Sequence, residues 1–113
     1  MSKYGNRKTQ VFGITFDSKA EALRYLALFD MRNNGEISHL RLQPEFELLP
    51  AFTSYGQRYR GIKYRADFGY FEGDKQVVED VKGGKATQTP VFLLKAKLFR
   101  YQYRDVELRV IEA

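Results

Sequence analysis

The stretch VVEDVKGG, residues 77–84, determines how the rest of the chain is interpreted. Two β-branched valines favour a buried strand, but Glu79, Asp80 and Lys82 follow them within the same few residues. Charged side chains are rarely buried without partners, so a strand of this composition needs a reason for its charges. The residues that a sheet would place beside this strand supply one.

The preceding segment, YRGIKYRADFGYF at residues 59–71, alternates between apolar and polar side chains as a half-buried strand does. Gly73 and Asp74 then fit a two-residue hairpin turn with glycine at its first central position. The turn joins this segment to QVVEDVK, residues 76–82, and therefore predicts an antiparallel pair of strands.

This hairpin brings charged residues together. In its register Asp67 lies directly opposite Asp80, with Cβ atoms about 4.5–5.5 Å apart. Lys82 points to the same side, because it lies two residues beyond Asp80. The polar side then holds Lys63, Arg65, Asp67, Asp80 and Lys82, and the apolar side holds Ile62, Tyr64, Ala66, Phe68, Tyr70, Val77 and Val81. Glu79 falls on the apolar side, which suggests a position near the edge of the sheet.

Two facing carboxylates repel each other unless one takes up a proton or both bind a cation. Their hard oxygen atoms suit Mg²⁺, with Mn²⁺ as a substitute. A neighbouring lysine can orient or activate a water molecule, or stabilise charge that builds on a phosphate. Gly83 and Gly84 leave the backbone bare, so that a phosphodiester could approach. The charges therefore predict a site on the outer face of the strand.

The alternative is that this face of the hairpin is only solvated, as charged faces usually are. The pattern Asp-x-Lys is weak by itself, because Asp17-Ser18-Lys19 matches it too. The opposed carboxylates, with the lysine at the right offset, are what favour a site.

Two helices flank the strands in the sequence. Residues 17–35, DSKAEALRYLALFDMRNNG, have Ser18 as N-cap and Gly35 as a stop. Thr89 caps a second helix over residues 90–103. The residues expected to be buried are Ala22, Leu23, Leu26 and Phe29 in the first helix, and Phe92 with Leu94 or Leu98 in the second.

The other segments complete the order of elements. Residues 1–9 are expected to form a loose basic arm, and VFGITF at 11–16 can add a short strand in front. LQPEFELL at 42–49 and VELRVIE at 106–112 are strands. The order α-β-β-β-α-β predicts an α/β fold with a mixed central β-sheet flanked by helices, in a single domain over residues 1–113.

The composition excludes several classes of protein. The chain has 113 residues, 43% of them hydrophobic, which indicates one globular domain. It has no cysteine for a disulfide or a thiolate zinc site, and His39 is its one histidine, which argues against a Ser-His-Asp triad. No apolar stretch is long enough for a membrane span or a signal peptide, so a cytoplasmic location is expected. The net charge of +5 is compatible with nucleic acid but does not establish it.

Asp67, twelve intervening residues and Asp80-x-Lys82, in this order of elements, resemble the PD-(D/E)XK nuclease superfamily with its restriction-endonuclease-like fold. Ala66 stands where that superfamily usually has proline. The chain is more closely similar to a group of small phage-associated predicted endonucleases. The segments that carry this similarity run from Lys3 to Tyr103 and include KYGN, FDS, LQP, ADF and VVEDVKG.

The resemblance implies roles for single residues. Asp67 and Asp80 would be metal ligands, Lys82 the catalytic lysine, and Glu21 the carboxylate that a helix adds to the metal site. Gln43 would be a polar residue near the site. Glu21 can instead close a capping box with Ser18, Gln43 can satisfy backbone groups, and Glu45 can replace Glu21 as third carboxylate.

The resemblance therefore predicts a Mg²⁺-dependent DNA endonuclease, structure-specific for branched DNA such as a Holliday junction, in the host cytoplasm if the chain is phage-encoded. The alternatives are a nucleic-acid-binding module without catalysis and, with less support, a structural interaction protein. Cleavage of two strands suggests a homodimer by analogy. The residues expected to contact DNA are Arg7, Lys8, Lys63, Arg65, Lys85, Lys95, Lys97 and Arg100.

Overall fold

A computed structural model describes residues 7–83 and 87–113. Its centre is a four-stranded sheet in the order β10-β9-β8-β3. The strands are β3 (Ser38–Leu42), β8 (Phe68–Glu72), β9 (Lys75–Lys82) and β10 (Val106–Glu112). Strand β10 runs parallel to β9, and the other neighbours are antiparallel. The sheet is therefore mixed, as the sequence predicts.

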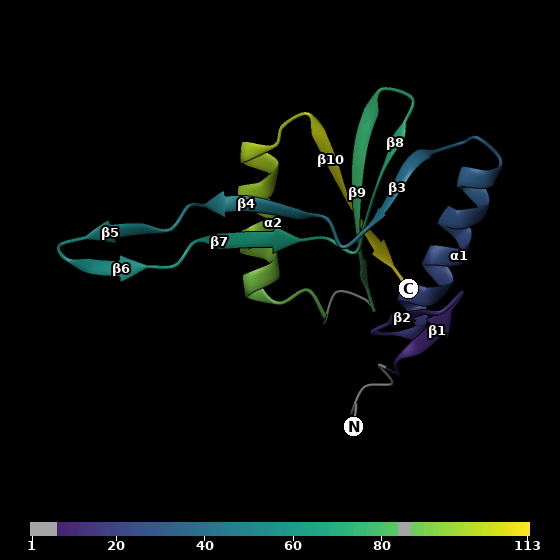
Figure 1. The fold of residues 1–113 in the computed structure, drawn as a ribbon, viewed down its shortest axis with the longest axis horizontal. Helices are drawn as coiled ribbons and strands as arrows, with labels where there is room; N and C mark the ends of the chain where they lie inside the picture. The colour runs from purple at the N-terminus through teal and green to yellow at the C-terminus, as the bar shows by residue number, and fades with distance from the viewer. Residues whose placement is uncertain (1–6, 84–86) are drawn as a thin grey trace.

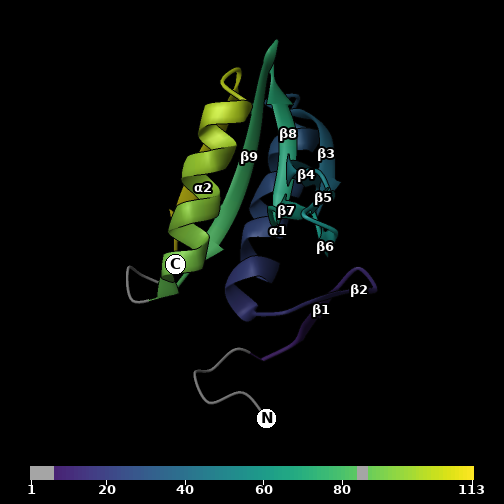
Figure 2. The same cartoon turned by 90° about the vertical axis from the view of Figure 1, so that its left-hand side faces the viewer.

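Two helices cover opposite faces of this sheet, α1 (Lys19–Asn33) and α2 (Pro90–Gln102) (Figure 1). Figure 2 shows the strands between them from the side. Neighbouring residues of β9 divide between the two faces, because Val77 belongs to the core under α1 and Val78 to the core under α2. The α/β class and the helices flanking a mixed sheet are confirmed, but the face of β9 that was expected to point outward is largely covered, because Val78 and Asp80 on that face are buried.

The hairpin of β8 and β9 has the predicted register. Phe68 pairs with Glu79 and Glu72 with Lys75, on either side of the turn at Gly73. Gly73 has a φ of 59°, a conformation that glycine adopts without steric cost.

Helix α1 begins at its N-cap Ser18, whose hydroxyl accepts a hydrogen bond from the Glu21 N–H. It ends before Gly35, as predicted. Ala22 is buried as predicted, together with Tyr25 and Leu28, and Leu26 and Phe29 are half-buried. Leu23, however, is 56% exposed, so its predicted burial is wrong. The Tyr25 ring packs against Phe16 and Phe68, and this contact turns Leu23 away from the core.

Helix α2 begins after Thr89, which accepts the Phe92 N–H, with Pro90 in the first turn. It buries Phe92, Ala96 and Phe99, whereas Leu94 is 59% exposed. Of the residues predicted to be buried, Phe92 is therefore correct and Leu94 is wrong; Leu98 is half-buried.

The segment predicted as one strand over residues 59–71 is broken at Ala66 and Asp67. Its first part, β7 (Ile62–Arg65), pairs with β4 (Glu45–Leu49) in a separate two-stranded sheet, and its second part is β8. Because the chain changes sheets at the break, Tyr64 and Ala66 pack under α2 while Phe68 and Tyr70 pack under α1. The single apolar face predicted for this segment is therefore wrong.

Beyond β4 and β7 the chain forms a second, narrower hairpin, β5 (Phe52–Ser54) and β6 (Gln57–Tyr59), which projects from the body of the molecule (Figure 1). The sequence pattern did not indicate it. Gly61 lies where this hairpin returns to β7, and a Cβ added there would be 2.7 Å from the Leu49 carbonyl oxygen.

At the N-terminal end, β1 (Thr9–Val11) and β2 (Ile14–Phe16) form a hairpin. The predicted single strand over 11–16 is therefore two strands, since Phe12 and Gly13 turn the chain with φ values of 52° and 79°. Residues 1–6 of the predicted arm lie outside the described residues, and Thr9 already belongs to β1. Among the residues that the structure describes, no helix is long and apolar enough to cross a membrane.

Candidate functional site

Asp67 occupies the break between β7 and β8, and hydrogen bonds hold its backbone and side chain. Its N–H donates to the Glu79 carbonyl at 2.9 Å, and its own carbonyl accepts the Gln43 N–H at 2.9 Å. The carboxylate oxygen Oδ2 accepts the Val81 N–H at 2.7 Å. These bonds to β9 and to the end of β3 fix the carboxylate beside the strand that carries Asp80.

Asp80 is buried in β9 with 5% of its surface exposed. Its Oδ2 accepts the Tyr64 hydroxyl at 2.5 Å, and its Oδ1 pairs with the Lys82 ammonium at 3.1 Å. Burial raises the pKa of Asp80; the Tyr64 hydroxyl opposes this rise, and the nearby negative charge of Asp67 adds to it. Burial followed by the charge of Asp80 also raises the pKa of Tyr64, so that this hydroxyl stays a donor. Asp67 accepts the N–H of the residue that follows Asp80, and both acids line the same groove, so they are close neighbours, as the register predicts.

Lys82 ends β9 in a confined position. Its ammonium lies 4.2 Å from the centre of the Phe92 ring, over the first turn of α2, and its side chain is 21% exposed. The carboxylate of Asp80 and the face of Phe92 both attract the charge and orient it. Lys82 therefore faces the groove from a fixed direction instead of extending freely into solvent.

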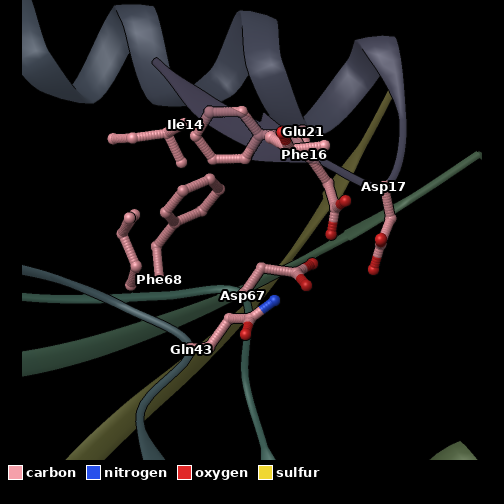
Figure 3. Close-up of a pocket in the computed structure, with 9 residues that line it drawn as sticks. Ile14, Phe16, Asp17, Glu21, Gln43, Asp67 and Phe68 are labelled. Atoms are coloured by element: carbon pink, nitrogen blue, oxygen red, sulfur yellow. The ribbon is translucent and has the colours of Figure 1, made fainter. Parts of the chain in front are cut away.

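Glu21 lies on the first turn of α1, and its carboxyl points toward that of Asp67 (Figure 3). Burial first, and then the Glu21 carboxyl, raise the pKa of Asp67 to about 7, against the opposing effects of the Val81 N–H and Lys82. Ser18 caps the helix, but within residues 7–83 and 87–113 no hydrogen bond runs back from its N–H to Glu21. The geometry thus directs Glu21 to Asp67 and not to a complete capping box.

Two cavities meet at Asp67. The smaller, of about 120 Å³, lies under the β1–β2 hairpin and is lined by Ile14, Thr15, Phe16, Asp17, Glu21, Leu42, Gln43, Asp67 and Phe68 (Figure 3). The larger is an open groove of about 480 Å³ between β4, β7, β9 and α2. Its lining includes Asp67, Asp80 and Lys82 with Gln43, Glu45, Lys63, Arg65 and Lys95. The acids are therefore accessible to a ligand that enters the groove.

Gln43 and Glu45 border these cavities in different ways. Gln43 adopts a φ of 50°, bonds through its N–H to Asp67, and its side chain points toward the Asp67 carboxylate (Figure 3). The backbone role that the sequence suggested is thus present, together with a position at the site. Glu45 is exposed on β4 and pairs with Lys63 at 3.8 Å, so a neighbouring cation already partly neutralises it.

A sequence model of the family described as "Protein of unknown function (DUF1064)" matches residues 1–113. The chain belongs to this family. No curated protein and no solved structure matches the chain. The family description names no activity, so the geometry of the site is what bears on function.

The residues expected to contact DNA are only partly brought together. Lys63, Arg65 and Lys95 line the groove. Lys97 and Arg100 do not line it, and the Arg100 guanidinium donates to the Leu108 carbonyl at 3.0 Å. Arg7 is exposed, and Lys8 pairs with Asp17 at 3.5 Å, near the β1–β2 hairpin. Lys85 and Gly84 lie outside the described residues.

Glu79 is not at a sheet edge, because β9 lies between β8 and β10. It is fully buried, and its carboxylate accepts Arg24 Nε at 2.7 Å and Nη2 at 2.6 Å. The Tyr70 hydroxyl donates to it at 2.6 Å. Glu79 is buried, and not at an edge as predicted, because a buried carboxylate needs donors and an arginine of α1 supplies two.

Sequence reasoning missed Tyr64, Phe92 and Asp17 as parts of the site. Tyr64 and Phe92 were assigned to the core, because an aromatic residue in an apolar pattern gives no sign that it contacts a charged group. Asp17 precedes the N-cap of α1, where an acid is common and carries no signal of its own.

The chemistry of the donors fits a divalent cation. Asp67, Asp80 and Glu21 offer carboxylate oxygens, and the raised pKa of Asp67 reflects burial and a neighbouring carboxyl, both of which a cation would compensate. Within the described part of the chain, no three Asp, Glu, His or Cys residues are grouped closely enough to hold an ion alone. Mg²⁺ commonly binds through one or two carboxylates and completes its shell with water and phosphate oxygens.

Proposed function

We propose that this protein is a Mg²⁺-dependent endonuclease that hydrolyses phosphodiester bonds in DNA. The observation that carries this proposal is the meeting of a half-buried acid, a buried acid and a lysine at one groove: Asp67 beside Asp80, with Lys82 at 3.1 Å from Asp80. A strand that only needed to be buried would gain nothing from these charges.

The arrangement of elements supports the proposal. The four strands of the central sheet and the two helices follow one another along the chain as α1, β3, β8, β9, α2 and β10. With the strands of the three two-stranded sheets set aside, this succession resembles the α-β-β-β-α-β order of the PD-(D/E)XK superfamily. Here Asp67 immediately precedes β8, and Asp80 and Lys82 belong to β9.

The acids, the lysine and the basic residues of the groove would have separate roles. Asp67 and Asp80, with Glu21 as third carboxylate, would hold Mg²⁺, which supplies a more acidic water molecule and neutralises charge on the phosphate. Lys82 would orient the attacking water or stabilise negative charge on the phosphate, since its ammonium is held at the groove by Asp80 and Phe92. Lys63, Arg65 and Lys95 would contact phosphates along the groove.

A nucleic-acid-binding module without catalysis is the second candidate. One observation favours it: within residues 7–83 and 87–113 no three potential ligands are grouped as a ready metal site. Against it, carboxylates that face a groove repel phosphates and would weaken a protein that only binds.

The test is a cleavage assay on linear, nicked, flap and four-way DNA, in Mg²⁺, Mn²⁺ or EDTA. We expect cleavage in either metal and none in EDTA. Asp80→Asn should abolish cleavage while DNA binding persists or strengthens, because the amide keeps an acceptor for Tyr64 but removes the charge that binds metal and repels phosphate.

The control is Asp74→Asn, which removes an acid from the β8–β9 turn, outside the residues that line either cavity. It should cleave like the parent. Metal-dependent cleavage by a contaminant-free Asp80→Asn preparation would contradict the proposed site. Binding of DNA by the parent with no cleavage in any metal would favour the second candidate.

A further inference from the structure

The hairpin of β5 and β6 projects from the body of the molecule as a two-stranded arm (Figure 1). Its strands pair Phe52 with Tyr59 and Ser54 with Gln57. The Phe52 and Tyr59 rings stack with their centres 5.0 Å apart and their planes at 16°. The two strands of the arm are thus joined by a stacked pair of aromatic rings.

The arm exposes aromatic side chains that a solvated hairpin does not need. Phe52 is 40% exposed, Tyr59 46%, and Tyr55 at the tip is fully exposed. Tyr55 also has a φ of 49°, a left-handed conformation in which turns favour glycine or asparagine. The two-residue turn between Ser54 and Gln57 requires this conformation, and the side chain placed there is a fully exposed ring. Exposed aromatic rings gathered on one projecting arm favour a contact surface.

The charge of the arm identifies the kind of partner. Residues 50–66 contain Arg58, Arg60, Lys63 and Arg65 and no acidic residue, although the chain has 14 acids elsewhere. Lys63 and Arg65 also line the groove of the candidate site. On β7, however, Lys63 and Arg65 lie opposite Glu47 and Glu45 of β4. The unbalanced positive charge is therefore that of Arg58 and Arg60 on the arm, which favours a polyanion as the partner of the arm.

We propose that this arm binds the DNA substrate where a base is exposed at the end of a paired region, such as a fork or a flap. This inference rests on the proposed function and specifies its substrate class. Arg58 and Arg60 contact backbone phosphates, and the Tyr55 ring stacks on the exposed base. Stacking on an aromatic side chain needs a free base face: the unpaired bases of a fork offer one, whereas a blunt duplex offers only the outer faces of its two terminal pairs.

The experiment measures binding by fluorescence anisotropy in EDTA, so that cleavage plays no part. Forked and blunt duplexes of the same sequence are compared for the parent protein, Tyr55→Ala and Tyr55→Phe. Tyr101→Ala is the matched control, because Tyr101 is a tyrosine that is 68% exposed but belongs to α2 and not to the arm.

We expect Tyr55→Ala to weaken binding to the fork by about 10-fold and to the blunt duplex by less than about 2-fold. Tyr55→Phe, which keeps the ring, and Tyr101→Ala should bind like the parent. Since Tyr55 is fully exposed, its variants should unfold at the parent's temperature.

An equal loss on both DNAs, or no loss on the fork, would overturn the assignment. If Tyr55→Ala differs from the parent in molar mass by light scattering but binds DNA equally well, the arm would instead be assigned to contacts between two copies of the chain. The DNA-binding role of the arm and the endonuclease activity can be tested separately. Asp80→Asn should lose cleavage and still show the Tyr55-dependent preference for the fork.

Discussion

At the scale of single residues, Asp67 is fixed before any ligand arrives. Backbone bonds to Glu79 and Gln43, and a bond from the Val81 N–H to its carboxylate, leave it little freedom. Its pKa of about 7 follows from burial and from the Glu21 carboxyl. An acid with this raised pKa titrates near neutral pH, and a bound cation would lower the pKa again.

The first prediction concerns the pH dependence of stability without metal. The folded pKa of Asp67, about 7, lies above its ordinary value of 3.8, so folding favours the protonated form. Stability should therefore fall as pH rises between about 4 and 7. Asp67→Asn removes this loss, and urea unfolding at pH 8 should show a gain of about 1–3 kcal/mol, limited by partial solvent exposure. At pH 3.5 the gain should vanish.

Added Mg²⁺ supplies the control for this prediction. It should stabilise the parent at pH 8 by binding the ionised carboxylates, and it should have little effect on Asp67→Asn. An Asp67→Asn protein that is less stable than the parent at pH 8 would show that the charge of Asp67 is favourable in the empty site.

The second prediction separates the two roles of Glu21. Glu21→Gln should leave the unfolding temperature without metal nearly unchanged, because the cap bond runs from its backbone N–H to Ser18. It should reduce Mg²⁺-dependent cleavage by orders of magnitude, since an amide holds a divalent cation poorly. Ser18→Ala should do the reverse, at a cost of about 0.5–2 kcal/mol of stability. Cleavage by Glu21→Gln at the parent's rate would leave Glu45 as the next carboxylate to test.

At the scale of elements, the contact between α1 and β9 determines where Glu21 lies. Arg24 lies one turn after Glu21 on α1 and makes two hydrogen bonds to the buried Glu79 of β9. Glu79 and Asp80 are consecutive residues of β9, so their carboxylates point to opposite faces of the sheet, Glu79 toward α1 and Asp80 toward the side covered by α2. The ion pair thus fixes the helix that carries Glu21 to the strand that carries Asp80.

The third prediction tests this contact. Arg24→Met leaves a buried carboxylate with Tyr70 as its remaining donor and should cost about 3 kcal/mol in urea unfolding. The double variant Arg24→Met/Glu79→Gln should recover part of that loss, because the neutral amide costs less to bury. Lys19→Ala, on an exposed position of the same helix, should change stability little. A double variant as unstable as Arg24→Met would assign the loss to packing of the arginine side chain instead of to charge.

At the scale of the whole molecule, the groove divides the basic residues of α2 into two classes. Lys95 lines it, whereas Lys97, two residues along the helix, does not. Residues two apart on an α-helix point about 200° apart, so one helix cannot present both side chains to the same bound strand. A polyanion bound in the groove would therefore meet Lys95 and not Lys97.

The fourth prediction uses this difference. Lys95→Ala should lower the slope of log binding constant against log salt by about one unit, as one phosphate contact is lost. Lys97→Ala is the matched control, with the same change of charge on the same helix, and should leave the slope nearly unchanged. Equal effects of the two variants would place DNA across α2 outside the groove.

The sequence by itself determined the features that depend on residues close together in the chain. The turn at Gly73, with the alternation around it, was sufficient to predict the register of β8 and β9 and thus Asp67 beside Asp80. The helix starts at Ser18 and Thr89 were predictable because a capping side chain bonds to the backbone three residues away. In each case the bond that selects the conformation is local.

The tertiary structure alone decided what depends on distant partners. The alternation over residues 59–71 is continuous, and only the pairing of β7 with β4 and of β8 with β3 and β9 breaks it at Asp67. Glu79 depends on Arg24, 55 residues away, which no periodicity connects to it. Alternation along a strand shows which side chains are apolar and which are polar. It does not show which sheet or helix packs against each face of the strand. That choice belongs to the long-range packing that also turned Asp67 toward Glu21.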